Sequence, residues 1–328
     1  MHHLRWGILG AGHIAQKFAT GLGTIKDQAA AQAIGSRSLE KARAFAQEYG
    51  LARAYGSYEE VLSDREVDIV YIALPNHLHA EWALRCAQAG KHILCEKPAT
   101  ANAAELEQVL AAVKRHNVFF MEAFMYRCHP QWDKVRELIA AGEIGEVRVL
   151  HSVFAYNTSW EEENARMYKE MAGGGLMDVG CYGVSFSRWI ACEEPSACHA
   201  VGHIGRQTEI DEQGAALLKF PSGIVASTIF ALKCAVPRIA GIYGSKGSIT
   251  LTDPWQPVDG EAAIILDAEG KSERFEIKTG LHLYANEALT VAKYINQRQC
   301  PAMTWQDSLG NMRALDALRA SMGLKWEG

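Results

Sequence analysis

The sequence predicts an α/β domain built on a parallel sheet, followed by a second domain built on a mostly antiparallel, open-faced sheet. At 328 residues the chain is long enough for two domains. Strand and helix patterns alternate up to about residue 122, which favours a parallel sheet with helices on both faces. Beyond that point, strand runs separated by turn signals dominate. We therefore expect domains at 1–122 and 123–328, with helices at about 284–325 packing back on the first domain.

Each element of the first domain has its own signal. Ser38 is an expected N-cap and Gly50 an expected helix end, and the segment SYEE at 57–60 is an expected capping box. Asn102 is expected to begin the helix that ends near His116. Strands are predicted at 4–9, 29–35, 67–74, 92–95 and 118–121. Ligands of such sheets lie at the carboxyl ends of the strands, so the residues after each strand are the candidate site.

The first strand is followed by the segment GAGHIA, a G-x-G-x-x-A pattern formed by Gly10, Gly12 and Ala15. Gly10 allows a tight turn, and Gly12 lets a pyrophosphate approach the helix N-terminus. His13 and Ile14 lie in the same turn and are expected to contact the cofactor. The pattern predicts a Rossmann dinucleotide site, and the alternative is an ordinary glycine-rich turn.

The second strand is followed by Ser36 and Arg37. A site selective for NAD places an acidic residue about 20 residues past the glycines, on the ribose hydroxyls. A guanidinium binds a 2′-phosphate, which a carboxylate would repel. We therefore predict NADP as the cofactor, with NAD as the alternative. Arg37 is otherwise a solvated residue at a helix start.

The third and fourth strands end on further polar residues. Pro75, Asn76 and His79 follow the third strand and are predicted to contact the cofactor, although Asn76 as a helix cap and His79 as a structural residue are alternatives. The fourth strand ends on Glu96 and Lys97 before Pro98, which disfavours a helical Lys97. A lysine here can donate to a substrate oxygen, and Glu96 can hold it or meet the cofactor.

The second domain carries an acid pair after the segment GGG at 173–175. Asp178 and Tyr182 are spaced to share one helix face. With Lys97 they form a predicted proton-transfer set, in which Lys97 lies within reach of Tyr182 or of a shared substrate oxygen. The alternative is Asp178 as an N-cap and Tyr182 as packing. Strand runs are predicted at 146–156, 214–221, 224–233, 238–243, 248–252, 262–267 and 273–278.

Four aromatic residues are candidates for a sugar pocket, although sheet packing is an equally good reading of each. They are Phe154, Tyr156, Trp160 and Trp255.

Composition excludes several classes of function. The net charge is −5 and basic residues do not cluster, so neither nucleic acid nor a membrane surface is an expected partner. The eight cysteines form no C-x-x-C pair, and no metal site is expected. Neither a membrane span nor a signal peptide is expected, which predicts a cytoplasmic protein.

In matching order, the segments GAGHIA, SRS, PNHLH, EKPA, MEAFMYRCHP and GGGLMDVGCY resemble the Gfo/Idh/MocA oxidoreductases. The resemblance is nearest to the branch of dimeric dihydrodiol dehydrogenase, NADP-dependent D-xylose dehydrogenase and glucose–fructose oxidoreductase. It implies a Rossmann domain, an open-faced sheet domain, and catalytic roles for Lys97, Asp178 and Tyr182.

The resemblance also implies NADP-dependent hydride transfer at a carbinol carbon of a sugar, polyol or trans-diol. It implies a homodimer, or a higher oligomer, formed through the sheet face. The alternative is a non-catalytic NAD(P)-binding regulatory protein of the same fold.

Overall fold

The computed structural model describes residues 3–158, 164–257 and 260–324. The chain divides into two compact units, each described by itself. Unit 1 comprises Met1–Cys128 and Leu281–Leu309, and unit 2 comprises His129–Gly280 and Gly310–Gly328.

Unit 1 is built on a six-stranded parallel sheet in the order β3-β2-β1-β4-β5-β6. The chain winds outward from β1 in one direction and from β4 in the other, so the order reverses between these two strands. A reversal of this kind opens a crevice at the carboxyl edge. The strands are β1 Leu4–Leu9, β2 Ala29–Gly35, β3 Arg53–Tyr55, β4 Ile69–Ile72, β5 His92–Glu96 and β6 Phe120–Ala123.

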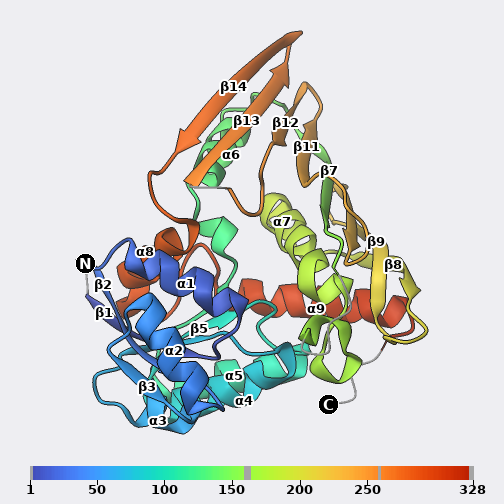
Figure 1. Ribbon diagram of the computed structural model, residues 1–328. Helices are drawn as coiled ribbons and strands as arrows, with labels where there is room; N and C mark the ends of the chain where they lie inside the picture. Colours follow the sequence, from blue (N-terminus) through green and yellow to red (C-terminus); the bar gives the residue numbers. More distant parts are fainter. Residues whose placement is uncertain (1–2, 159–163, 258–259, 325–328) are drawn as a thin grey trace. The chain divides into compact units, whose positions relative to one another are not determined.

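Helices cover both faces of this sheet. The pair α1–α8 packs on one face and the pair α4–α5 on the other (Figure 1), as right-handed crossovers require. The helices are α1 His13–Gly23, α2 Leu39–Tyr49, α3 Tyr58–Ser63, α4 His79–Gln88, α5 Ala103–His116 and α8 Leu283–Tyr294. Short 3₁₀ turns lie at Asn76–Leu78 (η1), Met125–Cys128 (η2) and Ile295–Gln297 (η7).

Local capping signals are confirmed at three helix ends. Ser38 accepts a hydrogen bond from the Lys41 N–H at the start of α2, and Gly50 ends that helix with a φ of 73°. Ser57 and Glu60 form a reciprocal capping box at the start of α3. Each side-chain cap contributes about 1 kcal/mol to the helix it begins.

An aromatic stack fills the core between α1 and the centre of the sheet. The ring of Phe18 stacks on Tyr71 with centroids 3.9 Å apart and meets the edge of Trp6 at 5.0 Å. All three side chains are fully buried. The Tyr71 hydroxyl donates to the carboxylate of Glu96, so this core reaches the carboxyl end of β5.

Unit 2 is built on an eight-stranded sheet in the order β14-β13-β12-β11-β7-β10-β9-β8. Every neighbouring pair is antiparallel except β7 and β10. The strands are β7 Val147–Ala155, β8 Ala197–Ile204, β9 Asp211–Lys219, β10 Val225–Ala231, β11 Ile239–Gly244, β12 Gly247–Leu251, β13 Glu261–Ala268 and β14 Lys271–Lys278.

Helix α7 covers the middle of one face of this sheet (Figure 1). A Cβ on Gly183 would lie 2.5 Å from Oγ1 of Thr228 on β10, so the absence of a side chain lets the helix lie close. Ser152 and Thr228 hydrogen-bond beneath it at 2.9 Å. The remaining helices are α6 Gln131–Ala140, the 3₁₀ turns η3 Ala165–Met167 and η4 Lys169–Met171, the π-helix η5 Leu176–Gly180, α7 Cys181–Ala191 and α9 Trp305–Ser321.

Two strands were absent from the sequence prediction, and one was displaced. The edge strand β3 has only three residues, and the edge strand β8 is largely exposed, so neither shows an apolar pattern. The last strand of unit 1 is Phe120–Ala123 rather than 118–121. Among the described residues, none of the helices is long and apolar enough to cross a bilayer.

Candidate active site

The glycine turn after β1 fits a dinucleotide pyrophosphate. Gly10 has a φ of 94°, and a Cβ there would lie 2.7 Å from the carbonyl oxygen of Ala73. Gly12 is exposed, and no atom of the described residues lies within 4 Å of the place where its Cβ would be. No side chain in the described chain caps α1 at Gly12. The open side of the turn therefore faces a helix N-terminus, which favours an anion.

Four other predicted cofactor residues lie near this turn or at the end of β2. His13 is exposed and Ile14 is half-buried in the first turn of α1. Arg37 is exposed directly after β2. Ser36 is nearly buried, and its hydroxyl accepts a hydrogen bond from the Ser38 N–H at 3.3 Å. Arg37 thus offers a charged donor at the strand end, whereas Ser36 helps to shape the turn.

The residues after β4 divide into an accessible pair and a buried histidine. Pro75 and Asn76 are half-buried at the start of η1. His79 is fully buried, with Nδ1 2.8 Å from the Pro98 carbonyl oxygen and Nε2 2.8 Å from that of Leu74. Both ring nitrogens face backbone groups, which favours the structural interpretation of His79 over direct contact with a cofactor.

The strand β5 ends on Glu96, which is buried, and Lys97, which is half-buried. One Glu96 oxygen accepts from the Tyr71 hydroxyl, and the other accepts from the Lys97 N–H at 3.2 Å. Burial, followed by the charge of Glu96, raises the pKa of Tyr71, which keeps its phenol a donor. Glu96 therefore fixes the backbone of Lys97. The Lys97–Pro98 peptide bond is cis.

In unit 2, Asp178 is held by two donors. The Tyr156 hydroxyl donates to Oδ2 at 2.5 Å, and Arg166 Nε donates to Oδ1 at 3.0 Å. Asp178 itself is 8% exposed. A carboxylate has about four lone-pair sites and can accept several hydrogen bonds at once. The trio is thus a charged hydrogen-bonding site with a fixed carboxylate.

The turn that carries Asp178 is a π-helix anchored from β9. Asp211 is 2% exposed and accepts from the Leu176 N–H at 2.5 Å. Burial raises the pKa of Asp211 to about 7. Gly174, with a φ of 113°, lies so close to this carboxylate that a Cβ would collide with it. The glycine run therefore leaves room for the Asp211 side chain. Asp178 lies within the π-helix η5 rather than at a helix N-cap.

Tyr182 lies one turn further on and packs among aromatic rings. Its ring meets Phe154 edge-on at 5.0 Å and Trp255 at 5.9 Å. Trp255 is fully buried, and its indole N–H donates to the Val153 carbonyl at 3.1 Å. These contacts favour packing roles for Trp255 and for Phe154, which is 4% exposed. Trp160 lies outside the described residues.

The sequence does not predict the hydrogen bonds that Arg166 and Tyr156 donate to Asp178. Tyr156 was assigned only as a pocket aromatic, although its position just past β7 is a strand-end signal of the kind used in the first domain. Arg166 is the middle residue of the three-residue 3₁₀ turn η3, and its surrounding sequence has no periodic pattern. Its pairing depends on the tertiary fold.

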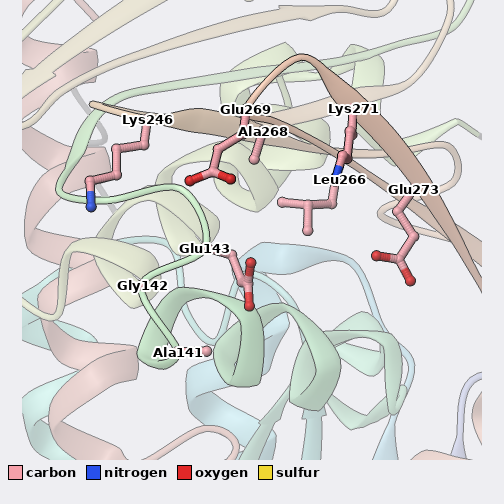
Figure 2. A pocket seen from close by; sticks show the side chains of 9 residues that line it. All are labelled: Ala141, Gly142, Glu143, Lys246, Leu266, Ala268, Glu269, Lys271 and Glu273. Carbon is pink, nitrogen blue, oxygen red and sulfur yellow. The ribbon is translucent and has the colours of Figure 1, made fainter.

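The pocket in Figure 2 is separate from all of these residues. It has a volume of about 250 Å³ and is lined by the loop after α6, the turn between β11 and β12, and the hairpin of β13 and β14. Acidic and basic side chains surround it together, including Glu143, Lys246 and Lys271, and their charges offset one another (Figure 2). It contains none of the predicted site residues.

A parallel sheet with a glycine turn after its first strand is typical of a dinucleotide-dependent oxidoreductase. Comparison with known families gives the narrower class. Residues 4–124 match the oxidoreductase family with an NAD-binding Rossmann fold, and residues 132–250 match the Gfo/Idh/MocA C-terminal domain. The chain belongs to the Gfo/Idh/MocA family of oxidoreductases. The predicted fold class and oxidoreductase activity are confirmed.

Individual relatives share most of the chain's length. Trans-1,2-dihydrobenzene-1,2-diol dehydrogenase of Xenopus tropicalis is 36% identical, over 83% of this chain and 81% of that protein. D-xylose 1-dehydrogenase (NADP(+)) 2 of Haloferax volcanii is 34% identical over 97% of each chain. The crystal structure of the 3-ketoreductase KijD10 from Actinomadura kijaniata, in complex with NADP and TDP-benzene, superimposes with a TM-score of 0.90 at 27% identity over 98% of each chain.

Proposed function

We propose that this oxidoreductase uses NADP to transfer a hydride at a carbinol carbon of a sugar, polyol or trans-diol. The observation that carries the proposal is Lys97, half-buried at the carboxyl edge of the sheet that also bears the glycine turn. The relatives named as dihydrodiol and D-xylose dehydrogenases support the substrate class.

Each site residue has a proposed role. The nicotinamide ring supplies or accepts the hydride when the cofactor is bound. Lys97 donates a hydrogen bond to the reacting oxygen and polarises it. Tyr182 exchanges the hydroxyl proton. Asp178, fixed by Tyr156 and Arg166, accepts a hydrogen bond from a substrate hydroxyl and so orients the carbinol carbon.

Tyr156 is the less suitable phenol for the proton-exchange role. Burial, followed by the charge of Asp178, raises its pKa well above the ordinary value for tyrosine. Its hydroxyl is also already committed to Asp178 at 2.5 Å. Tyr156 therefore remains a donor, and Tyr182 is the proposed acid–base group.

The cofactor preference depends on Arg37. We expect Arg37→Ala to weaken NADP+ binding by roughly 10- to 100-fold, the value of a charge-assisted hydrogen bond. NAD+ binding should change little, because NAD+ lacks the 2′-phosphate. Arg43→Ala, at an exposed arginine on α2, the helix that follows Arg37, is the matched control. An unchanged ratio of NADP+ to NAD+ affinity in Arg37→Ala would refute the phosphate assignment.

The function itself is tested by turnover. Purified protein is screened with NADP+ against aldoses, ketoses and trans-diols, and Lys97→Met is measured on each active substrate. We expect Lys97→Met to lower kcat/KM by about 10²- to 10⁴-fold, while Lys114→Met, an exposed lysine on α5, retains activity. If the variant and the wild type bind cofactor and turn over alike, the catalytic role of Lys97 is wrong. A protein that binds NADP+ without turnover would support the regulatory alternative.

Assembly and location extend the proposal. We propose a homodimer formed through the open face of the unit 2 sheet, where large apolar side chains are exposed on several strands. We also propose a cytoplasmic location, because all eight cysteines are free and a reducing compartment keeps them so.

A further inference from the structure

The turn that follows Lys97 is held by one side chain from α4, the helix after β4, and by one from β6. His79, the first residue of α4, contacts the Pro98 carbonyl at 2.8 Å through Nδ1. Glu122, on β6, accepts the Ala99 N–H at 2.9 Å through Oε1. Since β4, β5 and β6 are adjacent, consecutive residues of the turn are held from both sides.

His79 connects this turn to the end of the neighbouring strand. Its Nε2 lies 2.8 Å from the Leu74 carbonyl oxygen, so the ring spans from the end of β4 to Pro98. Two acceptors at this distance favour a protonated ring, whereas burial lowers the pKa of His79 to about 4. Burying an uncompensated cation costs more than one hydrogen bond gains. The ring is therefore neutral at neutral pH and donates to one carbonyl at a time.

Glu122 holds the other side and is fully buried. Burial raises its pKa to about 7. Its Oε1 accepts from the Ala99 N–H whether the carboxyl group is charged or neutral. Glu96 restrains the preceding residue by accepting the Lys97 N–H. The backbone is thus fixed on both sides of Lys97, while the Lys97 side chain is half-buried.

We propose that His79 and Glu122 are positioning residues for Lys97: by holding Pro98 and Ala99 they set where the lysine ammonium meets the reacting oxygen. The inference rests on the catalytic role proposed for Lys97. It gives His79 a positioning role in place of the predicted cofactor contact. It also gives a positioning role to Glu122, which the strand-end pattern alone does not predict. A misplacement of about 1 Å at a reacting group costs on the order of 100-fold in rate.

Paired substitutions separate this role from a general effect on folding. In His79→Asn, the side-chain amide falls near the position of Nδ1 and can still donate to the Pro98 carbonyl. In His79→Gln, the amide falls near the position of Nε2 and keeps only the contact with the Leu74 carbonyl. Both variants are polar and similar in size. Glu122→Gln keeps an acceptor for Ala99, whereas Glu122→Met removes it. His92→Asn, at the other end of β5, is the control for a histidine bonded to backbone.

We expect His79→Gln and Glu122→Met to lower kcat on the order of 100-fold. The NADP+ dissociation constant should stay within about threefold of wild type, because the glycine turn is untouched. The kcat of His79→Asn should be at least about tenfold higher than that of His79→Gln, and the same should hold for Glu122→Gln relative to Glu122→Met. His92→Asn should retain wild-type kcat. Thermal unfolding of each variant verifies that it is folded.

A second readout does not depend on turnover. Trinitrobenzenesulfonate labels accessible amines, and peptide mass spectrometry gives the rate at Lys97 with Lys114 as the internal reference. We expect His79→Gln and Glu122→Met to change the Lys97 rate relative to Lys114 by about threefold or more, and the conservative partners to leave it unchanged. If the wild type turns over no substrate, the proposed function fails while this measurement still tests the positioning role.

Three results would overturn the proposal. Equal losses of kcat in His79→Asn and His79→Gln would indicate a structural role alone. A rise in the NADP+ dissociation constant that matches the fall in kcat would indicate cofactor contact. Folded His79→Gln and Glu122→Met proteins with wild-type kcat and labelling would show that the turn needs neither residue.

Discussion

At the scale of single residues, the proposed chemistry depends on side chains whose partners are already fixed in the protein. Asp178 is the example in unit 2, because Tyr156 and Arg166 hold its two oxygens. On the sheet of unit 1, Glu96 is held in the same way by Tyr71 and by the Lys97 N–H. Groups fixed in this way need little rearrangement when a substrate binds, which is the usual source of catalytic advantage in such sites.

The contact between Tyr156 and Asp178 gives a prediction at this scale. Tyr156→Phe removes the hydroxyl that donates to Oδ2 of Asp178 at 2.5 Å and keeps the ring. A hydrogen bond to a charged group is worth about 1.5–3 kcal/mol, so kcat/KM should fall by roughly 10- to 100-fold. Steady-state kinetics on a substrate found in the screen measures this fall.

The pH profile of Tyr156→Phe provides the sharper part of that test. Because the Tyr156 phenol is a donor that stays protonated, its removal should leave the shape of the kcat profile unchanged. Tyr182→Phe should instead remove the limb that reports the proton-exchange group. Tyr243→Phe, at an exposed tyrosine on β11, is the control. Loss of that limb in Tyr156→Phe would exchange the roles of the two tyrosines.

At the scale of secondary-structure elements, β5 is fixed at both ends by hydrogen bonds from other segments. At its start, His92 accepts the Phe119 N–H through Nδ1 at 2.9 Å. At its end, Glu96 accepts a hydrogen bond from the Tyr71 hydroxyl on β4. The contact at His92 requires an unprotonated Nδ1, and burial, aided by the charge of Arg298, lowers the pKa of His92 to about 4.

The contact between His92 and Phe119 predicts how the stability of unit 1 depends on pH. The ordinary pKa of histidine is about 6.5, so between that value and about 4 the unfolded chain binds more protons than the folded one. The contribution of His92 is therefore complete above pH 6.5 and is lost as the pH falls toward 4. As the pH falls through this range, wild type should lose stability relative to His92→Asn. The side-chain oxygen of that variant accepts the same N–H but does not titrate.

Chemical denaturation at pH 7.5 and pH 5 tests the prediction. His92→Leu is the comparison, because it leaves the Phe119 N–H without this acceptor and, like His92→Asn, does not titrate. Relative to His92→Asn it should cost about 1–3 kcal/mol at both pH values. If the difference in unfolding free energy between wild type and His92→Asn is the same at both pH values, the lowered pKa of His92 is contradicted.

The elements also show which parts of the fold the sequence predicts. The bounds of β1 and β2 and the caps at Ser38 and Ser57 follow from residues close in sequence, and all were predicted. The strands β3 and β8 depend on pairing with a neighbour at a sheet edge, so their own residues carry no periodic signal. The same distinction applies to the candidate site. Strand-end positions such as Lys97 are predictable, whereas Arg166 is recognised only by its contact with Asp178.

At the scale of the whole molecule, the two sheets serve different purposes. The unit 1 sheet has helices on both faces and uses its carboxyl edge for the candidate site. The unit 2 sheet has α7 on one face, while large apolar side chains are exposed on the other. These are Val149, Val201, Leu217, Val225, Ile229 and Tyr243, which are between 38% and 63% exposed.

The register of the strands makes these side chains one surface. Val225 pairs with Val149, and Val149 pairs with Tyr243, so all three point to the same side of the sheet. Ser227, which points to that side of β10, pairs with Leu217. The alternate residues Ala226 and Phe230 are buried on the side of α7. An apolar patch across five adjacent strands is larger than a solvated surface usually carries.

This surface gives the prediction for assembly. The proposed partner is a second copy of the chain, and a two-fold dimer would bring each patch against itself. Leu217→Glu places a carboxylate in the middle of the patch, at a site that is 54% exposed in the single chain. In a dimer formed through this face that carboxylate would be buried, which costs several kcal/mol. Leu217→Glu should therefore be monomeric at micromolar concentration.

Analytical ultracentrifugation of wild type and variant measures the outcome. Leu39→Glu is the matched control, because Leu39 is 39% exposed and begins α2 in the other unit. Wild type and Leu39→Glu should sediment as dimers, and Leu217→Glu as a folded monomer with an unchanged thermal transition of its sheet domain. A monomeric wild type, or a Leu217→Glu protein that remains dimeric, would show that this face is not the interface. If Leu217→Glu remains dimeric, the exposed valines and leucine of the patch would need another partner.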